Sequence, residues 1–585
     1  MTLIIKFFLV ATSIFAIYAN VFALMSPLVL RGIFWGFIAI VVFLRPTKDP
    51  KKRWVFYLDV LFAILIGLST LLLVIRWEEF SWGIRDATPL ELAAGVVMIL
   101  LVLEATRRII GWFLVGMTII FILYGLYGDY APGIFQTLGY DIPRLVSFLF
   151  WDTHGLYGLP MYISASYVVL FVIFGSLLLK CGGERWFMDL SYAAVGRIRG
   201  GPALTAVVSS AFFGMLSGSP VANVVTTGSF TIPLMKKIGY RNHVAGAIEA
   251  VASTAGMFTP PIMGAGAFIM AEYVEIPYIK VAIAAAIPAF LFYFSIMLTV
   301  YIKAIKNNIP AISKDQVPDL IETLKKYGHL MPPLFILIWL LLIGWSIMWA
   351  AFWAIVSLVV LATLRKLTRM SVRTILDGLA DATERAIPVA VACAAAGIIY
   401  GVISGTGVGF KISSVLLSLA GGSKIMVLVF SALSGLLLGF AMPPSASYVI
   451  LAALIVPSLT EIGLAPLTAH MFIFIFCCVG PITPPVALAA YSAAGIANAE
   501  PNKTGFTAFG MGMAGYIIPF LFVYSPQLLF MGSIIKIIGT TSIVLLGLAL
   551  FVISLEGFFI KRLSWAFRGI FLAAVLLIFI VASML

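Results

Sequence analysis

Hydroxyl and amide side chains gather beside proline and glycine inside the apolar segments of this 585-residue chain. One group surrounds Pro220 and another surrounds Pro444, while two Thr-Pro-Pro phrases stand at residues 259–261 and 483–485. Such side chains cap helices, and together with freed backbone carbonyls they bind anionic groups and small hard cations. The chemistry that these residues predict is therefore ligand binding at helix ends.

The two groups repeat each other at a constant distance along the chain. Pro220 and Pro444, Gly239 and Gly463, and Thr259 and Thr483 each lie 224 residues apart. When the sequence is laid over itself at this offset, residues 210–265 give thirteen identities in 56 positions. This predicts an internal duplication. Proline and glycine in the middle of apolar segments in both copies indicate the binding site of a transporter.

Two sets of candidate residues follow from the duplication. The tip residues would hold an anionic substrate at helix N-termini; they are Ser217, Ser219, Asn223, Thr226, Thr227, Ser445 and Ser447. The residues of the two interrupted segments suit a cation such as Na⁺; they are Ser253, Thr254, Gly256, Thr259, Cys478, Gly480 and Thr483. For any single residue, a helix cap or a local hydrogen bond is the alternative interpretation.

Glu249 is the acidic side chain set well inside a repeat, and its counterpart at position 473 is isoleucine. A carboxyl group within a membrane segment is a candidate proton carrier or counter-charge for a cation. A hydrogen-bonded structural glutamate is the alternative.

The composition identifies a membrane protein. Hydrophobic residues make up 62% of the chain and charged residues 10%, which predicts an all-α polytopic membrane protein. The net charge of +13 lies in short clusters between apolar spans, so it indicates membrane orientation and not nucleic-acid binding. The sequence has no Walker A, G-x-S-x-G or H-E-x-x-H motif, which argues against an ATPase or an enzyme. An intramembrane enzyme built on Glu249 remains the alternative from another functional class.

The apolar spans and their charged flanks predict the elements that position these residues. Spans are expected at 4–24, 27–44, 55–75, 90–105, 109–127, 160–180, 279–301, 384–404, 509–529, 533–553 and 564–583, with two short spans in 331–364 and a polar surface helix in 302–329. The basic cluster of Arg45, Lys48, Lys51, Lys52 and Arg53 predicts a cytoplasmic loop, and Glu78, Glu79 and Asp86 then lie outside.

The segments 201–216 and 220–235 are each too short to span, at about 24 Å of helix. Basic residues flank both ends, so they predict a re-entrant hairpin whose tip, 217–223, lies within the membrane. The second hairpin, 425–440 and 445–460, lacks these basic flanks, which predicts an inverted copy. Residues 242–273 and 467–497 are expected to be broken helices that restart at Thr259-Pro260 and Thr483-Pro484.

Four of these stretches carry a family resemblance. The sequences at 217–240, 252–264, 442–457 and 477–497 resemble the large membrane subunit of tripartite ATP-independent periplasmic (TRAP) transporters. L-V-L-E-A-T-R-R-I-I-G-W at 101–112 resembles the TAXI-type branch, in which the small and large membrane subunits are fused. The resemblance covers about residues 30–530.

The resemblance implies an elevator-type transporter with inverted repeats, two re-entrant hairpins and two broken helices. Residues 1–155 would be scaffold helices like the small subunit, and 156–530 the large-subunit-like domain, with repeats at about 160–301 and 384–530; residues 531–585 would be extra helices. A soluble periplasmic binding protein would deliver a small organic acid to this multi-pass protein in the lipid of a bacterial inner membrane. Uptake would be coupled to Na⁺ or, alternatively, to protons.

The sequence departs from the family pattern at three positions. Pro220 stands where a small residue is expected, and Ala255 and Met257 replace an expected glycine and glutamine. These departures leave the coupling cation open between sodium and the proton. A stand-alone elevator symporter for dicarboxylates, which would need no binding protein, is a further alternative.

Overall fold

The computed structural model describes residues 2–45, 53–81, 87–311 and 317–584. Lys48, Lys51, Lys52 and Asp86, which contribute to the predicted orientation, lie outside these described residues. Within the described ranges, 12 helices are long and apolar enough to cross a membrane. The β-structure found in these ranges is one isolated antiparallel bridge between Phe558 and Arg562. The predicted all-α polytopic membrane fold is confirmed.

The chain forms two compact units, and neither is continuous in sequence. Unit 1 comprises Met1–Cys181, Pro332–Val427 and Ala441–Ser458, whereas unit 2 comprises Gly182–Met331, Leu428–Phe440 and Leu459–Leu585. The boundaries predicted at residues 155 and 530 separate regions that resemble different subunits. Compactness is a different property, so these boundaries stay a prediction.

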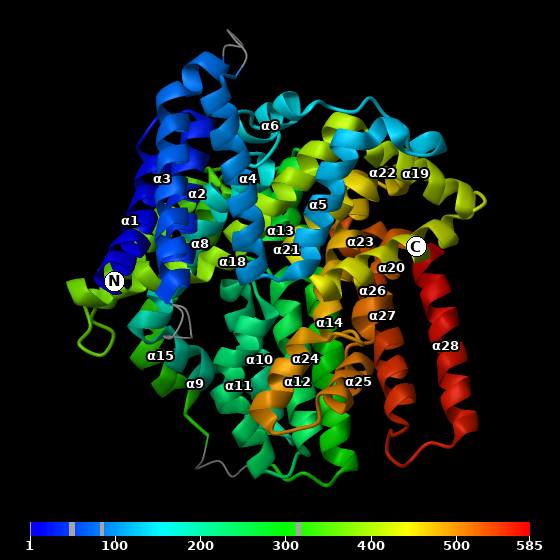
Figure 1. The fold of residues 1–585 in the computed structure, drawn as a ribbon. Coiled ribbons are helices and arrows are strands. Elements are labelled where there is room, and N and C mark those ends of the chain that lie inside the picture. The colour runs from blue at the N-terminus through cyan, green and yellow to red at the C-terminus, as the bar shows by residue number, and fades with distance from the viewer. Residues whose placement is uncertain (1, 46–52, 82–86, 312–316, 585) are drawn as a thin grey trace. The chain divides into compact units, whose positions relative to one another are not determined.

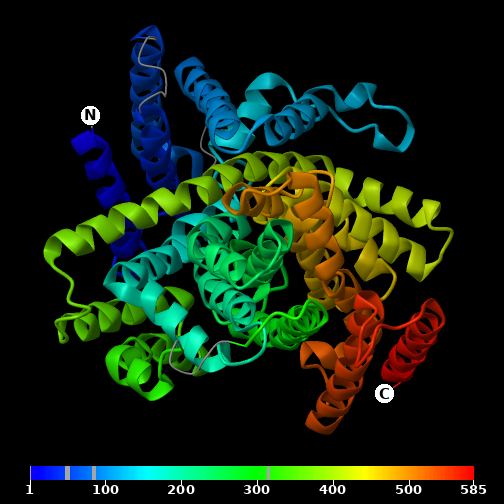
Figure 2. The same cartoon turned by 90° about the horizontal axis from the view of Figure 1, so that it is seen from below.

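Unit 1 is built around one long helix, α18 (Val372–Thr406), which is the long yellow-green helix in Figure 2. Helices from both ends of the unit pack on it, including α1, α5, α8 and α21. The other helices of unit 1 are α1 (Thr2–Val21), α2 (Pro27–Leu44), α3 (Arg53–Ser81), α4 (Pro89–Ile109), α5 (Trp112–Tyr127), α6 (Ile142–Phe150), α7 (Leu159–Ile163), α8 (Val169–Leu178), α16 (Pro332–Leu342), α17 (Ile347–Thr363), α19 (Val408–Leu419) and α21 (Pro444–Leu454).

Polar contacts fix the first helices of unit 1 to α18. The Ser13 hydroxyl lies 2.8 Å from the Thr383 hydroxyl, and both are buried. Lys6 Nζ pairs with Asp377 at 2.5 Å. Buried hydroxyl pairs satisfy each other where no water is available, so they define one register between α1 and α18.

Unit 2 holds the first hairpin, both broken helices and the end of the chain. Its elements are α9 (Glu184–Val195), α10 (Gly201–Ser217), α11 (Pro220–Lys237), α12 (Asn242–Ala255), η5 (Gly256–Phe258), α13 (Ala265–Tyr273), α14 (Tyr278–Lys306), α15 (Leu320–Tyr327), most of α20 (Lys424–Ala441), α23 (Pro466–Val479), η8 (Gly480–Ile482), α24 (Leu488–Ala497), α25 (Pro501–Met511), α26 (Ala514–Tyr524), α27 (Ile534–Glu556) and α28 (Trp565–Met584). In Figure 1, α27 and α28 are the red antiparallel pair.

Most of the predicted elements are confirmed, and the first hairpin is formed by α10 and α11 with limits close to those predicted. The polar stretch contains α15, and residues 331–364 form two short helices, α16 and α17. The structure also contains α6 and α19, which the pattern of apolar spans does not predict, because both are shorter than a membrane span.

One predicted helix is wrong as a single element. The arm 445–460 ends with α21 at Leu454, and a second short helix, α22 (Val456–Glu461), follows. Pro457 lacks a backbone N–H, which removes an i→i−4 hydrogen bond there. The span predicted at 509–529 overlaps the candidate membrane span Pro501–Tyr524, in which α25 and α26 meet at a turn at Gly512 and Met513.

Candidate functional site

The first hairpin tip, in unit 2, consists of Ser217 at the end of α10 and the two residues Gly218 and Ser219 that connect it to α11. Gly218 takes a left-handed conformation with φ 59°, and Ser219 is the N-cap of α11. The Ser219 hydroxyl accepts a hydrogen bond from the backbone N–H of Ala222 at 3.4 Å, and Pro220 is the first helical residue. The predicted Ser-Pro helix start is confirmed, and its N-terminus presents backbone N–H groups to the tip.

The second tip lies in unit 1, where α21 begins at Pro444 without a side-chain cap. Ser445 and Ser447 are buried there, and the Ser447 hydroxyl donates to the carbonyl of Pro443 at 3.2 Å. The seven predicted substrate residues are thus divided, with five in unit 2 and these two in unit 1.

Glu249 on α12 is enclosed by hydroxyl groups. Its side chain is fully buried, and Oε1 accepts hydrogen bonds from Ser210 on α10 at 2.7 Å and from Ser253 at 3.3 Å. Thr227 and Thr231 of α11 also donate to its two oxygens. Among the described residues no lysine or arginine forms an ion pair with it. This hydroxyl cage joins both hairpin arms to the first broken helix.

Several predicted substrate residues bond inward, to the protein itself. The Asn223 amide donates to the Ser210 carbonyl at 2.9 Å, and the Thr226 hydroxyl donates to the Ala222 carbonyl at 2.9 Å. Ser210 and Thr231 were absent from the predicted set. A signal for Thr231 existed in the spacing of residues 223, 227 and 231, which puts the three side chains on one face of α11.

The broken helices restart later than predicted. The first breaks after Ala255 and resumes at Ala265, and the second breaks after Val479 and resumes at Leu488. The predicted starts at Thr259-Pro260 and Thr483-Pro484 are therefore wrong. Both threonines are extended, with ψ near 120°, because a following proline excludes the helical region for the residue before it. The bonds Pro260–Pro261 and Pro484–Pro485 are both cis.

Each break lies against a glycine of a hairpin arm in unit 2. A Cβ added to Gly256 would lie 2.3 Å from the Cα of Gly214 on α10. A Cβ added to Gly480 would lie 2.3 Å from the backbone of Gly439 on α20. The same glycine–glycine crossing thus occurs in both copies of the repeat, where two backbones approach without side chains between them.

A threonine and a tyrosine pair at each break. The Thr259 hydroxyl donates to the Ala255 carbonyl at 2.7 Å and lies 3.5 Å from the hydroxyl of Tyr293 on α14. The Thr483 hydroxyl donates to the Val479 carbonyl at 2.8 Å and lies 2.7 Å from the hydroxyl of Tyr516 on α26. The repeat offset does not align the two tyrosines, because they lie 223 residues apart, one short of that offset.

The remaining predicted cation ligands lie around these two breaks. Ser253 and Thr254 lie in the last turn of α12, whose carbonyls lack intrahelical partners. The Gly256 and Gly480 carbonyls accept from the N–H of Thr259 and Thr483 at 3.3 and 2.8 Å. Cys478 is fully buried in α23. Hydroxyl and carbonyl oxygens fit a hard cation such as Na⁺, whereas no cluster of three His, Cys, Asp or Glu side chains is found among the described residues.

Parts of this chain are similar in sequence to known proteins. A family model described as the DctM component of tripartite ATP-independent periplasmic transporters matches residues 97–537. A C4-dicarboxylate TRAP transporter large permease of Pseudomonas aeruginosa is 30% identical over 159 residues, which are 27% of this chain and 37% of the relative.

Two further relatives carry other substrate names. An isethionate TRAP transporter permease, DctMQ, of Oleidesulfovibrio alaskensis is 30% identical over 126 residues, which are 21% of this chain and 18% of the relative. An ectoine/5-hydroxyectoine TRAP large permease of Ruegeria pomeroyi is 29% identical over 143 residues, which are 24% of this chain and 33% of the relative. The matches to these three proteins span between 18% and 37% of their lengths.

Proposed function

Because the chain belongs to the DctM family of tripartite ATP-independent periplasmic transporters, we propose that it is the membrane permease of a secondary-active importer. The family is one of transporter permeases and not of enzymes, so the intramembrane-enzyme alternative is set aside. The proposed reaction is uptake of a small organic acid across the bacterial inner membrane, driven by a cation gradient, with a soluble periplasmic protein delivering the substrate.

The duplicated breaks carry this proposal. In both copies a helix is interrupted where two glycines cross, and a threonine–tyrosine pair lies beside the break. The breaks supply carbonyl and hydroxyl oxygens. Broken helices of this type supply the coupling-ion sites of secondary transporters. Sodium is the favoured ion, and its ligands would come from the seven predicted cation residues.

The substrate class follows from the hairpin tips. The stretches 217–227 and 442–447 contain no lysine or arginine, so an anion would be held by helix N-termini and by hydroxyl or amide groups. The three relatives are named for C4-dicarboxylates, isethionate and ectoines. A small carboxylate or a similarly sized polar solute agrees with both observations.

The architecture proposed for this importer is the TAXI type, with residues 1–155 acting as the fused small subunit. Unit 2 contains both helix breaks and five of the seven predicted substrate residues, and we propose that this unit, together with the second hairpin tip, carries the substrate in an elevator movement. Fusion to a small subunit favours dependence on a binding protein over the stand-alone symporter.

The proton is the second candidate for the coupling ion, and the hydroxyl cage favours it. The cage hydroxyls make six contacts with acceptor oxygens, which belong to Glu249 and to the carbonyls of Asn223 and Thr227. Each of the four hydroxyls has one hydrogen, so they can donate in only four of the six contacts. A hydrogen on Glu249 would satisfy one more of these contacts.

Reconstitution into proteoliposomes tests the proposed function. Uptake of a radiolabelled dicarboxylate mixture should require an inward cation gradient and a soluble periplasmic binding protein. Replacing Na⁺ by choline at constant pH should abolish sodium-coupled uptake and leave proton-coupled uptake unchanged.

Three outcomes of this assay have different meanings. Uptake that needs ATP and no ion gradient would refute secondary transport. Full uptake without any soluble protein would establish the stand-alone symporter instead. Uptake of taurine-like sulfonates or ectoines in place of carboxylates would keep the mechanism and change the substrate class.

A further inference from the structure

The last two helices, α27 and α28, are almost entirely outside the matched family range, which ends at residue 537. Both belong to unit 2. They pack on α14 through a small apolar cluster that contains Ile302, Val552 and Ile553. Ion pairs and hydrogen bonds add to this apolar packing and attach the two helices to the rest of unit 2.

Charged groups join α27 to α14. Lys303 Nζ lies 2.8 Å from Oε1 of Glu556, whose side chain is 11% exposed. Lys306 Nζ donates to the backbone carbonyl of Glu556 at 2.6 Å, so it caps the last turn of α27 where the helix dipole favours a cation. Two lysines of α14 therefore hold one end of α27.

The returning helix α28 is also fastened at both ends. Arg568 Nη2 donates to the Leu555 carbonyl at 2.7 Å, and the Ser554 hydroxyl donates to the Arg568 carbonyl at 2.9 Å. Near the other end, the Ser525 hydroxyl, just after α26, donates to the Ala582 carbonyl at 3.0 Å. The pair α27–α28 thus contacts both α14 and the end of α26.

The helices α14 and α26 carry the two tyrosines of the breaks. They cross at Phe292 and Gly515, where a Cβ added to the glycine would lie 2.5 Å from the phenylalanine ring. Tyr293 and Tyr516 are the next residues on the two helices. A shift of either helix at this crossing would therefore displace a tyrosine hydroxyl from its threonine.

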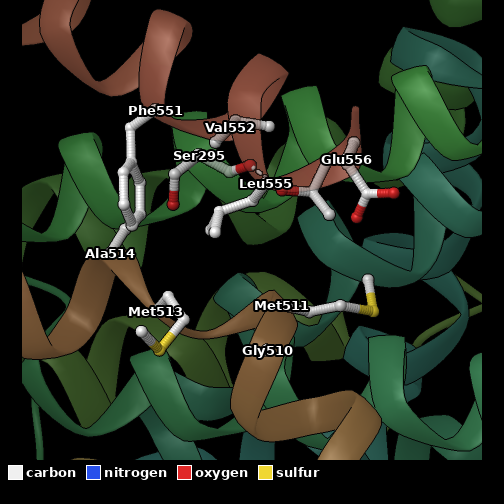
Figure 3. A pocket seen from close by; sticks show the side chains of 10 residues that line it. Ser295, Gly510, Met511, Met513, Ala514, Phe551, Val552, Leu555 and Glu556 are labelled. Carbon is white, nitrogen blue, oxygen red and sulfur yellow. Dashed lines mark hydrogen bonds between the residues drawn. The ribbon is translucent and has the colours of Figure 1, made fainter. Parts of the chain in front are cut away.

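Figure 3 shows where α27 meets this assembly. A cavity of about 10 Å³, roughly the room for one water molecule, is lined from three directions. Ser295 and Thr299 come from α14. The end of α25 and the start of α26 supply Gly510, Met511, Met513 and Ala514, and the last turns of α27 supply Phe551, Val552, Leu555 and Glu556. The last turns of α27 therefore lie against α14 and the start of α26 at one place.

We propose that α27–α28 is a brace that positions Tyr293 and Tyr516 at the two helix breaks, with Lys303 and Glu556 as its positioning residues. The brace acts by holding α14 and α26 at a constant spacing. Its effect on ion coupling rests on the proposed function, whereas its effect on the tyrosines does not.

Charge exchange in the full-length protein tests the brace. The variants are Lys303→Glu, Glu556→Lys and the double exchange, and Lys561→Glu is the matched control, because it makes the same charge change as Lys303→Glu in the exposed loop before α28. The neutral variants Lys303→Met and Glu556→Gln replace them if a reversal fails to fold. Fluorine NMR of 3-fluorotyrosine at position 516, in lipid nanodiscs, reports the tyrosine environment.

The expected result has two parts. Each single reversal should move the fluorine resonance and raise the half-saturating cation concentration for uptake about tenfold, and the double exchange should restore both. Lys561→Glu should change neither. An unmoved resonance in the single reversals, or no restoration in the double exchange, would overturn the brace. A moved and restored resonance in a protein whose uptake ignores cations would support the brace and refute the proposed coupling.

Discussion

At the scale of single residues, Glu249 is the clearest departure from the internal repeat. Its counterpart is Ile473, so the two copies are chemically unequal at this point. The carboxyl is fully buried, and its partners are hydroxyl groups of Ser210, Thr227, Thr231 and Ser253. Burying a carboxylate without a cation would cost several kcal/mol of desolvation free energy. Glu249 is therefore either protonated or paired with a bound cation.

Glu249→Gln distinguishes these roles. Glutamine has nearly the same shape, and its amide supplies hydrogens to the cage, so the protein should fold normally. If Glu249 carries the proton, uptake driven by a pH gradient should fall to background in proteoliposomes. Transport that responds to the pH gradient as before would leave Glu249 a structural role.

Thr231→Val is the companion variant for that measurement. It removes one donor to the carboxyl and should lower the free energy of unfolding by about 1–3 kcal/mol. Because valine and threonine have similar shapes, a thermal unfolding midpoint equal to that of the native protein would show that this hydrogen bond contributes nothing.

At the scale of secondary-structure elements, the two helix breaks depend on contact between backbones. Gly256 and Gly480 have φ of −53° and −49°, so any residue could adopt their backbone conformation. What excludes a side chain is the glycine on the neighbouring arm. The requirement for glycine is therefore steric and belongs to the packing of two elements.

Gly256→Ala and Gly480→Ala should each destabilise the protein by about 1–3 kcal/mol, because the added methyl group must push the hairpin arm away. Gly495→Ala on α24 is the control, since a Cβ there meets nothing within 4 Å. Removing this helical glycine should be neutral or stabilise by up to about 1 kcal/mol. Unfolding in detergent measures both effects, and equal midpoints for all three variants would contradict the crossing.

At the scale of the whole molecule, the chain passes between its two units repeatedly, and the second hairpin contributes to both. The elevator mechanism that we propose requires unit 2 to move against unit 1. The four cysteines Cys181, Cys393, Cys477 and Cys478 are buried. Thiol-reactive dyes should therefore label cysteines introduced on the surface in preference to these.

Single-molecule fluorescence transfer tests that movement. Dyes on Lys366→Cys in unit 1 and Lys503→Cys in unit 2 should report two exchanging distances whose populations shift when cation and substrate are added. A second pair, Lys237→Cys and Lys503→Cys, lies within unit 2 and should keep one distance. A single distance for both pairs under all conditions would exclude an elevator movement of unit 2.

The sequence by itself determined the class of protein, the duplication and the first hairpin. Apolar length and charge flanks are local properties, and the Ser219-Pro220 helix start is encoded within three residues. The tertiary structure decided which groups meet. The helix restarts at Ala265 and Leu488, the cage around Glu249 and the pairing of Tyr293 and Tyr516 with threonines all depend on contacts between segments far apart in the chain. Hydrophobic pattern carries no information on such pairings, because in a membrane every span is apolar and only close packing selects its neighbour.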